Sequence, residues 1–281
     1  MKNLLVPIDF SEYAYNACLY ALHLASKSSA NVTLFHTYHI PIIDPMMPAE
    51  YLSDLAESAE KDIRAKMEKV VTQLKEYKSQ RHLPEFEIST SITMGFAVDE
   101  ILLSCEKLSP DMIIMGRRFT EGMTKVLLGS VTSSIIEKAP VPIIVIPENV
   151  SAEKLVTDIL YASEFNDEDK RALNYLIEFS KALKTKVHCI HVASTADAGS
   201  EQKMTELEAQ FSAEKNAGLV EFHNVNSEGV EEGLLHYADS KHISMMAMLT
   251  HRRKFFVKLF DRSLTKKIAF KTNIPLMVFH A

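Results

Sequence analysis

The sequence has few cysteines, no long apolar run and no excess of basic residues, and each shortage narrows the class of protein. Only three cysteines occur among 281 residues, and they are far apart without metal-ligand spacing. This usage favours a reducing, cytosolic compartment. No segment approaches the roughly 20 apolar residues of a membrane span, and the opening apolar run is too short for a signal peptide. We therefore expect a cytoplasmic protein that has no membrane partner.

The charge balance and the missing catalytic signatures exclude further classes. The net charge of −6 and the pI near 6.0 argue against a protein that coats nucleic acid. The P-loop pattern Gly-x4-Gly-Lys-Ser/Thr and the zinc pattern His-Glu-x-x-His are absent, and no serine stands in Gly-x-Ser-x-Gly. Nothing supplies a convincing acid/base pair for turnover, so we expect a protein that is not an enzyme.

What the chain does contain is an internal repeat. The segment LVPIDFS near the N-terminus corresponds to LYASEFN from residue 160, which places Asp9 opposite Glu164 and, at the same spacing, His36 opposite His191. Later in each copy a second constant spacing aligns DMIIM with SMMAM and VPIIVIP with IPLMVFH. The length also fits about two domains. We assign the copies to residues 1–148 and 152–281, with the boundary at the polar break after Pro147.

Apolar runs alternate with helical patterns within each copy. In the first copy we predict strands near 3–8, 31–37, 86–93, 112–116 and 142–146, and helices near 12–26, 50–79, 97–108 and 129–139. Strands that alternate with helices imply a parallel sheet with crossover connections. The predicted fold is therefore α/β: two tandem doubly wound, Rossmann-like domains, each with a five-stranded parallel-type sheet and flanking helices.

Several local features follow from this pattern. Ser11 and Asn166 are the expected N-caps of the first helix of each copy. The apolar stripe of the long helix 50–79 is expected to pack on the sheet. His36 and His191 occupy equivalent strand positions, which favours a shared structural role over catalysis. The last strands of the two copies are expected to pair across an internal pseudo-two-fold, because bare apolar edge strands aggregate.

In a doubly wound sheet, ligands bind beyond the carboxyl ends of the strands. Three segments of the first copy are expected to converge there. They are Pro7-Ile8-Asp9 after the first strand, Thr37 after the second, and the stretch from Met115-Gly116 to Gly129-Ser130 after the fourth. Gly116 is expected to begin a loop, and Gly129-Ser130 to open a helix whose free amides suit a phosphate.

These residues resemble the universal stress protein family over essentially the whole chain, as a tandem two-domain member. The family shows an early Pro-x-Asp, often followed by Phe-Ser, and a later Gly-x2-Gly-x9-Gly-Ser/Thr. The resemblance implies adenine-nucleotide-α-hydrolase-like domains that bind ATP, with Asp9 and Thr37 at the adenine and ribose end. Magnesium would accompany the nucleotide. The residues implied around the phosphates are Gly116, Arg118, Gly129, Ser130 and Val131.

The sequence departs from the family pattern in both copies. Phe119 stands where the second motif glycine belongs, so the first copy is either a nucleotide site with an obstructed loop or a degenerate loop that keeps only its turn. In the second copy the three glycine positions are Leu249, Arg252 and Arg262. ATP binding in the family's mode is therefore not expected there.

Three functions remain open at this stage. The first is a stress-responsive, non-catalytic protein with nucleotide bound in the first domain only. The second is a nucleotide-independent scaffold for self-association or for an unknown protein partner, and the third, on fold analogy alone, is a weak nucleotide hydrolase or transferase. The basic and aromatic loop 251–262 suits either an anionic partner or packing over the strand ends. The acidic chain favours packing.

Overall fold

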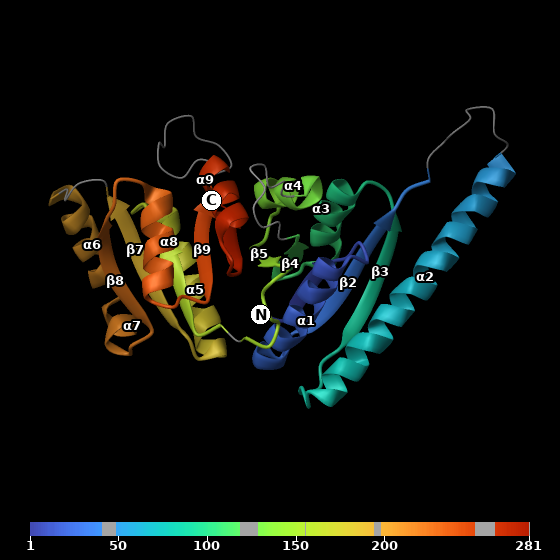
Figure 1. The fold of residues 1–281 in the computed structure, drawn as a ribbon, viewed down its shortest axis with the longest axis horizontal. Coiled ribbons are helices and arrows are strands. Elements are labelled where there is room, and N and C mark those ends of the chain that lie inside the picture. The colour runs from blue at the N-terminus through green and yellow to red at the C-terminus, as the bar shows by residue number, and fades with distance from the viewer. Residues whose placement is uncertain (41–48, 119–128, 155, 194–197, 251–261, 281) are drawn as a thin grey trace.

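One continuous sheet organises the whole chain (Figure 1). The computed structural model describes residues 1–281 apart from 41–48, 119–128, 155, 194–197, 251–261 and 281. In the first half the strands are β1 (Asn3–Pro7), β2 (Asn31–Tyr38), β3 (Ile88–Met94), β4 (Met112–Arg117) and β5 (Ile143–Pro147). The second half supplies β6 (Asp158–Ala162), β7 (Lys186–Ala193), β8 (Val220–Asn226), β9 (Met245–Thr250) and β10 (Leu276–His280).

The ten strands lie in the order β3-β2-β1-β4-β5-β10-β9-β6-β7-β8. All pairings within a half are parallel, and the order reverses beside β1, between β2 and β4. The halves meet where β10 pairs antiparallel with β5, with Leu276 opposite Val145 and Val278 opposite Ile143. The expected doubly wound halves and the expected pairing of the last strands are confirmed.

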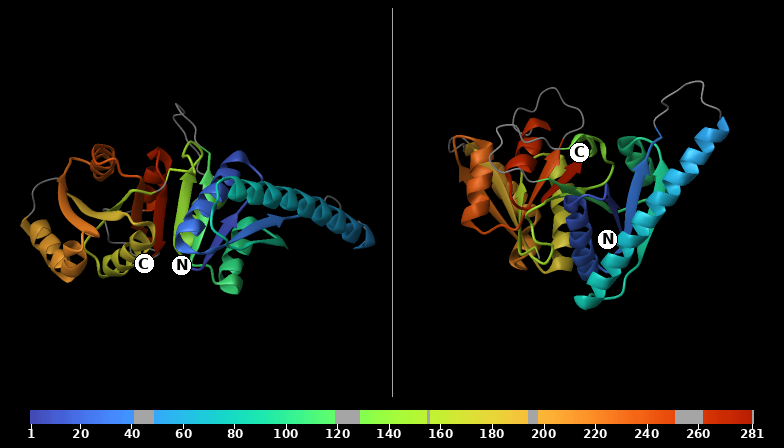
Figure 2. Two further views of the ribbon diagram at one scale, coloured as in Figure 1. Left: turned by 90° about the horizontal axis from the view of Figure 1, so that it is seen from below. Right: turned by 45° about the vertical axis from the view of Figure 1, so that its right-hand side comes forward.

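Two layers of helices bury the two faces of the sheet (Figure 2). One core lies under α1 (Glu12–Ser28), α2 (Ala49–Gln80), α5 (Asp167–Leu183) and α6 (Ala198–Gln210), and the short helix α7 (Ser212–Asn216), which buries none of its own residues, follows α6. The opposite core lies under α3 (Ala97–Leu108), α4 (Ser130–Lys138), α8 (Val230–Ser240) and α9 (Arg262–Lys271). Central strands are apolar on both faces because both faces are covered, as in β4 and β9, where every residue is buried.

The first helix of each half begins where its capping residue predicts. Ser11 has extended backbone, and its hydroxyl accepts a hydrogen bond from the Ala14 N–H at 3.3 Å. Asn166 has the equivalent place before α5, and its own N–H donates to the carboxylate of Asp169 at 2.8 Å. Each cap fixes the chain directly after the first strand of its half, and in the first half this is where the sequence predicts a site.

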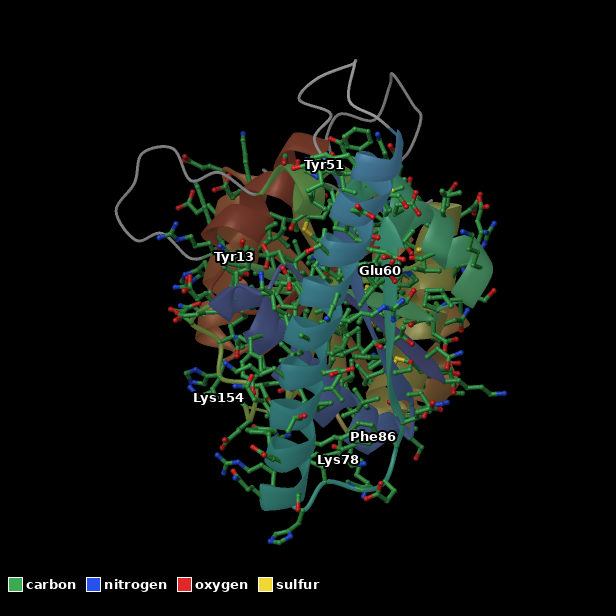
Figure 3. The ribbon with its side chains drawn as sticks, turned by 90° about the vertical axis from the view of Figure 1, so that its right-hand side faces the viewer. Tyr13, Tyr51, Glu60, Lys78, Phe86 and Lys154 are labelled. Carbon is green, nitrogen blue, oxygen red and sulfur yellow. The ribbon has the colours of Figure 1, made fainter. Side chains whose placement is uncertain are left out.

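The long helix α2 packs on the sheet with only part of its length, and Figure 3 shows Tyr51 near one end of this helix and Lys78 near the other. Met67 and Leu74 are fully buried, and Lys78 near the C-terminal end lies 4.6 Å over the Phe86 ring. Leu55, which belongs to the predicted apolar stripe, is instead 39% exposed, and Tyr51 is 55% exposed. The packing predicted for the stripe is therefore correct for the C-terminal part and wrong at Leu55, where the helix no longer lies over the core.

Further hydrogen bonds tie the two halves together beside the β5–β10 pair. The Asn16 side-chain amide donates to the Val150 carbonyl at 2.8 Å, so α1 holds the linker. His280 at the end of β10 contacts the Ile136 carbonyl of α4 through Nε2 at 2.6 Å. None of the helices in the described part of the chain is long and apolar enough to cross a membrane.

Candidate functional site

A cavity of about 460 Å³ opens at the carboxyl ends of β1, β2 and β4, where the strand order reverses. All ten residues that the sequence predicts at the site line it: Pro7, Ile8, Asp9, Thr37, Met115, Gly116, Arg118, Gly129, Ser130 and Val131. Arg117, from the predicted stretch after the fourth strand, lines it as well, and sequence reasoning missed the other residues of its wall, which are Tyr13, Ala14, Phe35, His36, Ala97, Ile101 and Thr132. Most of these come from helices or from the strand interior, where a motif search does not look.

The carboxylate of Asp9 is fixed at the mouth of this cavity by its own neighbours. It accepts hydrogen bonds from the Ser11 N–H at 3.0 Å, from the Ser11 hydroxyl, and from the Tyr13 hydroxyl at 2.8 Å. Partial burial alone would raise its pKa, but these donors outweigh burial and hold the pKa below its usual value. Asp9 is therefore an ionised, oriented acceptor at neutral pH.

Gly116 is required by packing as well as by the site. The sequence predicts that it begins a loop, but it lies inside β4, and this expectation is wrong. A Cβ at position 116 would lie 2.1 Å from the Tyr13 carbonyl oxygen and 3.0 Å from the Ala14 nitrogen. The missing side chain lets the first turn of α1 settle on β4, and this turn carries Tyr13 and Ala14 into the cavity wall.

Gly129 has a different environment. It caps α4, as expected, and as a glycine it makes no side-chain hydrogen bond to the first turn. Among the described residues, the nearest atom to a Cβ there would be the Thr132 hydroxyl oxygen, at 4.0 Å. The N-terminus of α4 presents its first N–H groups, which have no partner among the described residues, and the positive end of its dipole to the cavity, with the exposed Ser130 beside them. These are the groups that bind an anion.

Arg117, the last residue of β4, and Arg118, directly after it, act in different places. Arg118 is exposed at the cavity, and its charge acts on the Tyr13 hydroxyl. Arg117 is 3% exposed and donates to the carbonyl of Thr272 in the second half; burial lowers the pKa of its guanidinium to about 10. Phe119 lies outside the described residues, and so does the basic-aromatic loop predicted at 251–262, except for Arg262.

The paired histidines have the structural role that the sequence predicts. Nδ1 of His36 contacts the Ile8 carbonyl at 2.6 Å, and its ring packs 4.5 Å from that of Phe10, which has a φ of 64°. His191 repeats this arrangement with the carbonyl of Ser163, and its ring lies 4.4 Å from that of Phe165, whose φ is 63°. In both halves a histidine of the second strand contacts the turn that follows the first strand and holds it in place.

In the second half, larger buried side chains stand at two positions that line the cavity in the first half. Asp169 stands where Ala14 stands in the first half, and it is 1% exposed. Its carboxylate accepts hydrogen bonds from the Tyr161 hydroxyl at 2.5 Å and from the Ser163 hydroxyl at 3.0 Å. Leu249, buried at the place of Gly116, keeps the first turn of α5 from approaching β9 as closely as α1 approaches β4.

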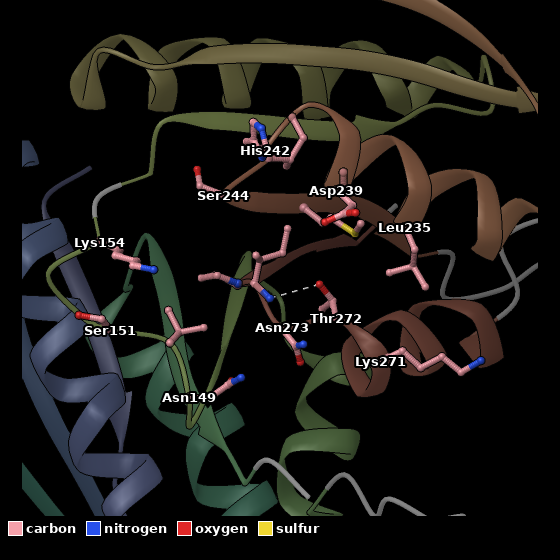
Figure 4. Close-up of a pocket in the computed structure, with 16 residues that line it drawn as sticks. Asn149, Ser151, Lys154, Leu235, Asp239, His242, Ser244, Lys271, Thr272 and Asn273 are labelled. Atoms are coloured by element: carbon pink, nitrogen blue, oxygen red, sulfur yellow. Dashed lines mark hydrogen bonds between the residues drawn. The ribbon is translucent and has the colours of Figure 1, made fainter. Parts of the chain in front are cut away.

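A second cavity, of about 490 Å³, lies at the junction of the halves (Figure 4). The linker, the end of α8 and the turn before β10 form its walls, in part through Ser151, Asp239 and Asn273. The Ile274 N–H donates to the Thr272 hydroxyl at 3.3 Å across the turn. None of the ten residues predicted at the site lines this cavity, which mixes lysines with an aspartate.

The fold and the first cavity define the class: a tandem doubly wound, Rossmann-like α/β protein whose first half has an open pocket at the strand switch point. The chain belongs to the universal stress protein family, whose model matches residues 1–147 and 156–280. Its similarity to characterised sequences extends over both halves. Membership is consistent with a role in the stress response.

Two relatives and one solved structure illustrate the resemblance. The universal stress protein Slr1230 of Synechocystis sp. is 24% identical and aligns with 99% of this chain and 100% of its own length. The universal stress protein MJ0577 of Methanocaldococcus jannaschii is 26% identical over 52% of this chain and 94% of its own. A universal stress protein from Archaeoglobus fulgidus has the same two-half fold, with a TM-score of 0.75, 19% identity, and coverage of 99% and 98% of the two chains.

Proposed function

We propose that the chain is a stress-responsive protein that binds an adenine nucleotide, ATP in the first instance, in its first half only and without turnover. One observation carries the proposal. Segments far apart in the sequence converge on one cavity in the first half, while in the second half Asp169 and Leu249 stand at the places of Ala14 and Gly116 in the cavity wall. The cavity has the size and the mix of apolar wall and few polar groups that small-ligand pockets have.

The two ends of the cavity suit the two ends of a nucleotide. Ile8, Phe35 and Met115 line it with apolar surface that matches a purine base. Asp9 supplies an ionised acceptor for ribose hydroxyls. The open N-terminus of α4 at Gly129 supplies unpaired amides for phosphate oxygens, and Arg118 adds positive charge beside them. Magnesium would enter with the phosphates, since Asp9 is the one carboxylate in the cavity wall described here.

The way in which the titratable groups are held supports the proposed absence of turnover. The lowered pKa of Asp9 makes it a weak base, and its carboxylate already accepts three hydrogen bonds. Nδ1 of His36 is engaged by the Ile8 carbonyl. Neither group is poised to move a proton at a bound phosphate. The residues instead orient and retain a ligand.

Calorimetric titration of the full chain with ATP tests this function. We expect one site per chain, release of nucleotide on denaturation as a raised absorbance at 260 nm, and no phosphate release with magnesium above the buffer rate. A stoichiometry of two would contradict the assignment to the first half. The absence of affinity at millimolar ATP would leave the scaffold function in its place, and steady phosphate release would replace it with a hydrolase.

A further inference from the structure

Two histidines and a glutamate gather in the second half, far from the cavity. His188 lies near the start of β7, and Glu221 and His223 near the start of β8, with His188 directly opposite Glu221 in the register. One ligand atom from each of the three lies within 4.8 Å of the others. The cluster is at the amino ends of the strands, under the end of α8, where the Tyr237 hydroxyl lies 3.1 Å from Nδ1 of His188.

The carboxylate of Glu221 stands between the two rings. Its Oε2 atom is 3.9 Å from Nδ1 of His188 and 3.5 Å from Nε2 of His223. Lys186 holds the other oxygen, Oε1, at 2.7 Å. Tetrahedral ligands at zinc bond lengths of about 2.0–2.1 Å stand roughly 3.4 Å apart, so small rotations bring all three atoms into coordination. The lysine leaves Oε2 directed at the imidazoles.

The remaining nitrogen of His188 supports the same interpretation. The residue is 6% exposed, and its Nε2 atom is buried without a hydrogen-bond partner in the described structure. Oδ2 of Asp158 lies 3.7 Å from this Nε2. Metal-bound histidines usually donate their second N–H to a carboxylate, which fixes the ring. Coordination through Nδ1 would direct the Nε2–H at Asp158 and give the orphaned atom a partner.

The first half provides an internal comparison. By the repeat, His188 corresponds to Thr33, and the strand register matches Glu221 and His223 to Ser89 and Ser91. In the first half, the Thr33 and Ser89 hydroxyls bond to each other at 3.0 Å. The same fold therefore closes this position with small hydroxyls. The second half carries three potential metal ligands, two imidazoles and one carboxylate, in their place.

We propose that His188, Glu221 and His223 form a binding site for one divalent zinc-type metal ion, with Asp158 orienting His188. Two imidazoles and one carboxylate are a ligand set that zinc takes with a fourth position open. Glu221 and His223 are partly exposed, so that position faces solvent. The site lies in the second half and is independent of the nucleotide proposed for the first.

Dialysis of the chelator-treated full chain against Zn²⁺, followed by metal analysis, tests the site. We expect one ion per chain, and Co²⁺ in its place should give the intense visible absorption of tetrahedral coordination without a thiolate band, since the three cysteines are all buried. His223→Ser should weaken binding by at least about a hundredfold, and Asp158→Asn by roughly 10- to 100-fold. His236→Gln, an exposed histidine on α8, is the matched control and should bind as wild type.

A second variant guards against misfolding of a single mutant. The triple change His188→Thr, Glu221→Ser, His223→Ser copies the first half, and its helix content by circular dichroism should match wild type. Zn²⁺ should raise the melting temperature of wild type and leave that of the triple variant unchanged. Failure of wild type to take up Zn²⁺ or Co²⁺ would overturn the proposal, as would wild-type affinity in the triple variant.

Discussion

A methyl group on Gly116 would lie 2.1 Å from the carbonyl oxygen of Tyr13. The contact is with backbone, which cannot rotate away, so Gly116→Ala must push α1 off β4. We expect the free energy of unfolding to fall by about 3 kcal/mol, the upper part of the range for overpacking. Urea denaturation measures it. Gly129→Ala, where the nearest described atom to the added methyl is the Thr132 hydroxyl oxygen at 4.0 Å, is the matched control; it loses only the preference for glycine at an N-cap and should stay within about 1 kcal/mol of wild type.

Gly129→Arg should remove ATP binding without destabilising the fold. The second half carries Arg262 at the corresponding place and still begins a helix there. The variant should therefore melt within a few degrees of wild type while its ATP affinity falls below detection, because the long side chain enters the cavity at the amides of α4. Titration calorimetry and a thermal melt of the same sample decide this. Unchanged ATP affinity would exclude the helix terminus as the phosphate site.

The acid sensitivity of the first half should depend on Asp9. Its pKa is lower in the folded chain than the ordinary 3.8, so its hydrogen bonds stabilise the fold above about pH 4. This contribution is lost as the pH falls through the lower, folded value. Asp9→Asn should make the stability of the chain less dependent on pH between about 5 and 3. Denaturant melts across that range test it, and identical pH profiles would contradict it.

His36 and His191 should stabilise the fold to a similar extent. His36→Ala and His191→Ala each remove a ring contact and a hydrogen bond to a carbonyl, which together stabilise the fold by about 1–2 kcal/mol. Since the sites lie in different halves, the effects should add in the double variant. Urea titration of the three variants provides the measurement. A loss confined to His36 would show that this residue does more than hold a turn.

Much of the fold followed from the sequence because it depends on local periodicity and on the repeat. The strand positions, the capping by Ser11 and the start of α4 at Gly129 all come from patterns within a few residues. The pairing of β5 with β10 followed from the need to cover apolar edges. The cavity residues could be predicted because strand ends in this topology converge on one edge.

The missed features depend on contacts between segments distant in the chain. Gly116 was expected in a loop because its backbone contact with Tyr13 is invisible until α1 is placed on β4. The buried hydrogen bonds of Asp169 gave no signal in the sequence, since its partners Tyr161 and Ser163 lie beside it only when α5 packs on the sheet. His188 and Glu221 become neighbours through the register of β7 and β8. No spacing rule for metal ligands detects such a pair.

The antiparallel pairing of β5 with β10 is an interface between two halves of one chain, so the halves cannot dissociate into separate subunits. A pair of separate copies would come apart on dilution, whereas these halves are joined by a covalent linker, so their association does not vary with protein concentration. A homodimer must also carry every substitution twice. Here one copy is free to diverge in its ligand chemistry while it continues to complete the sheet of the other.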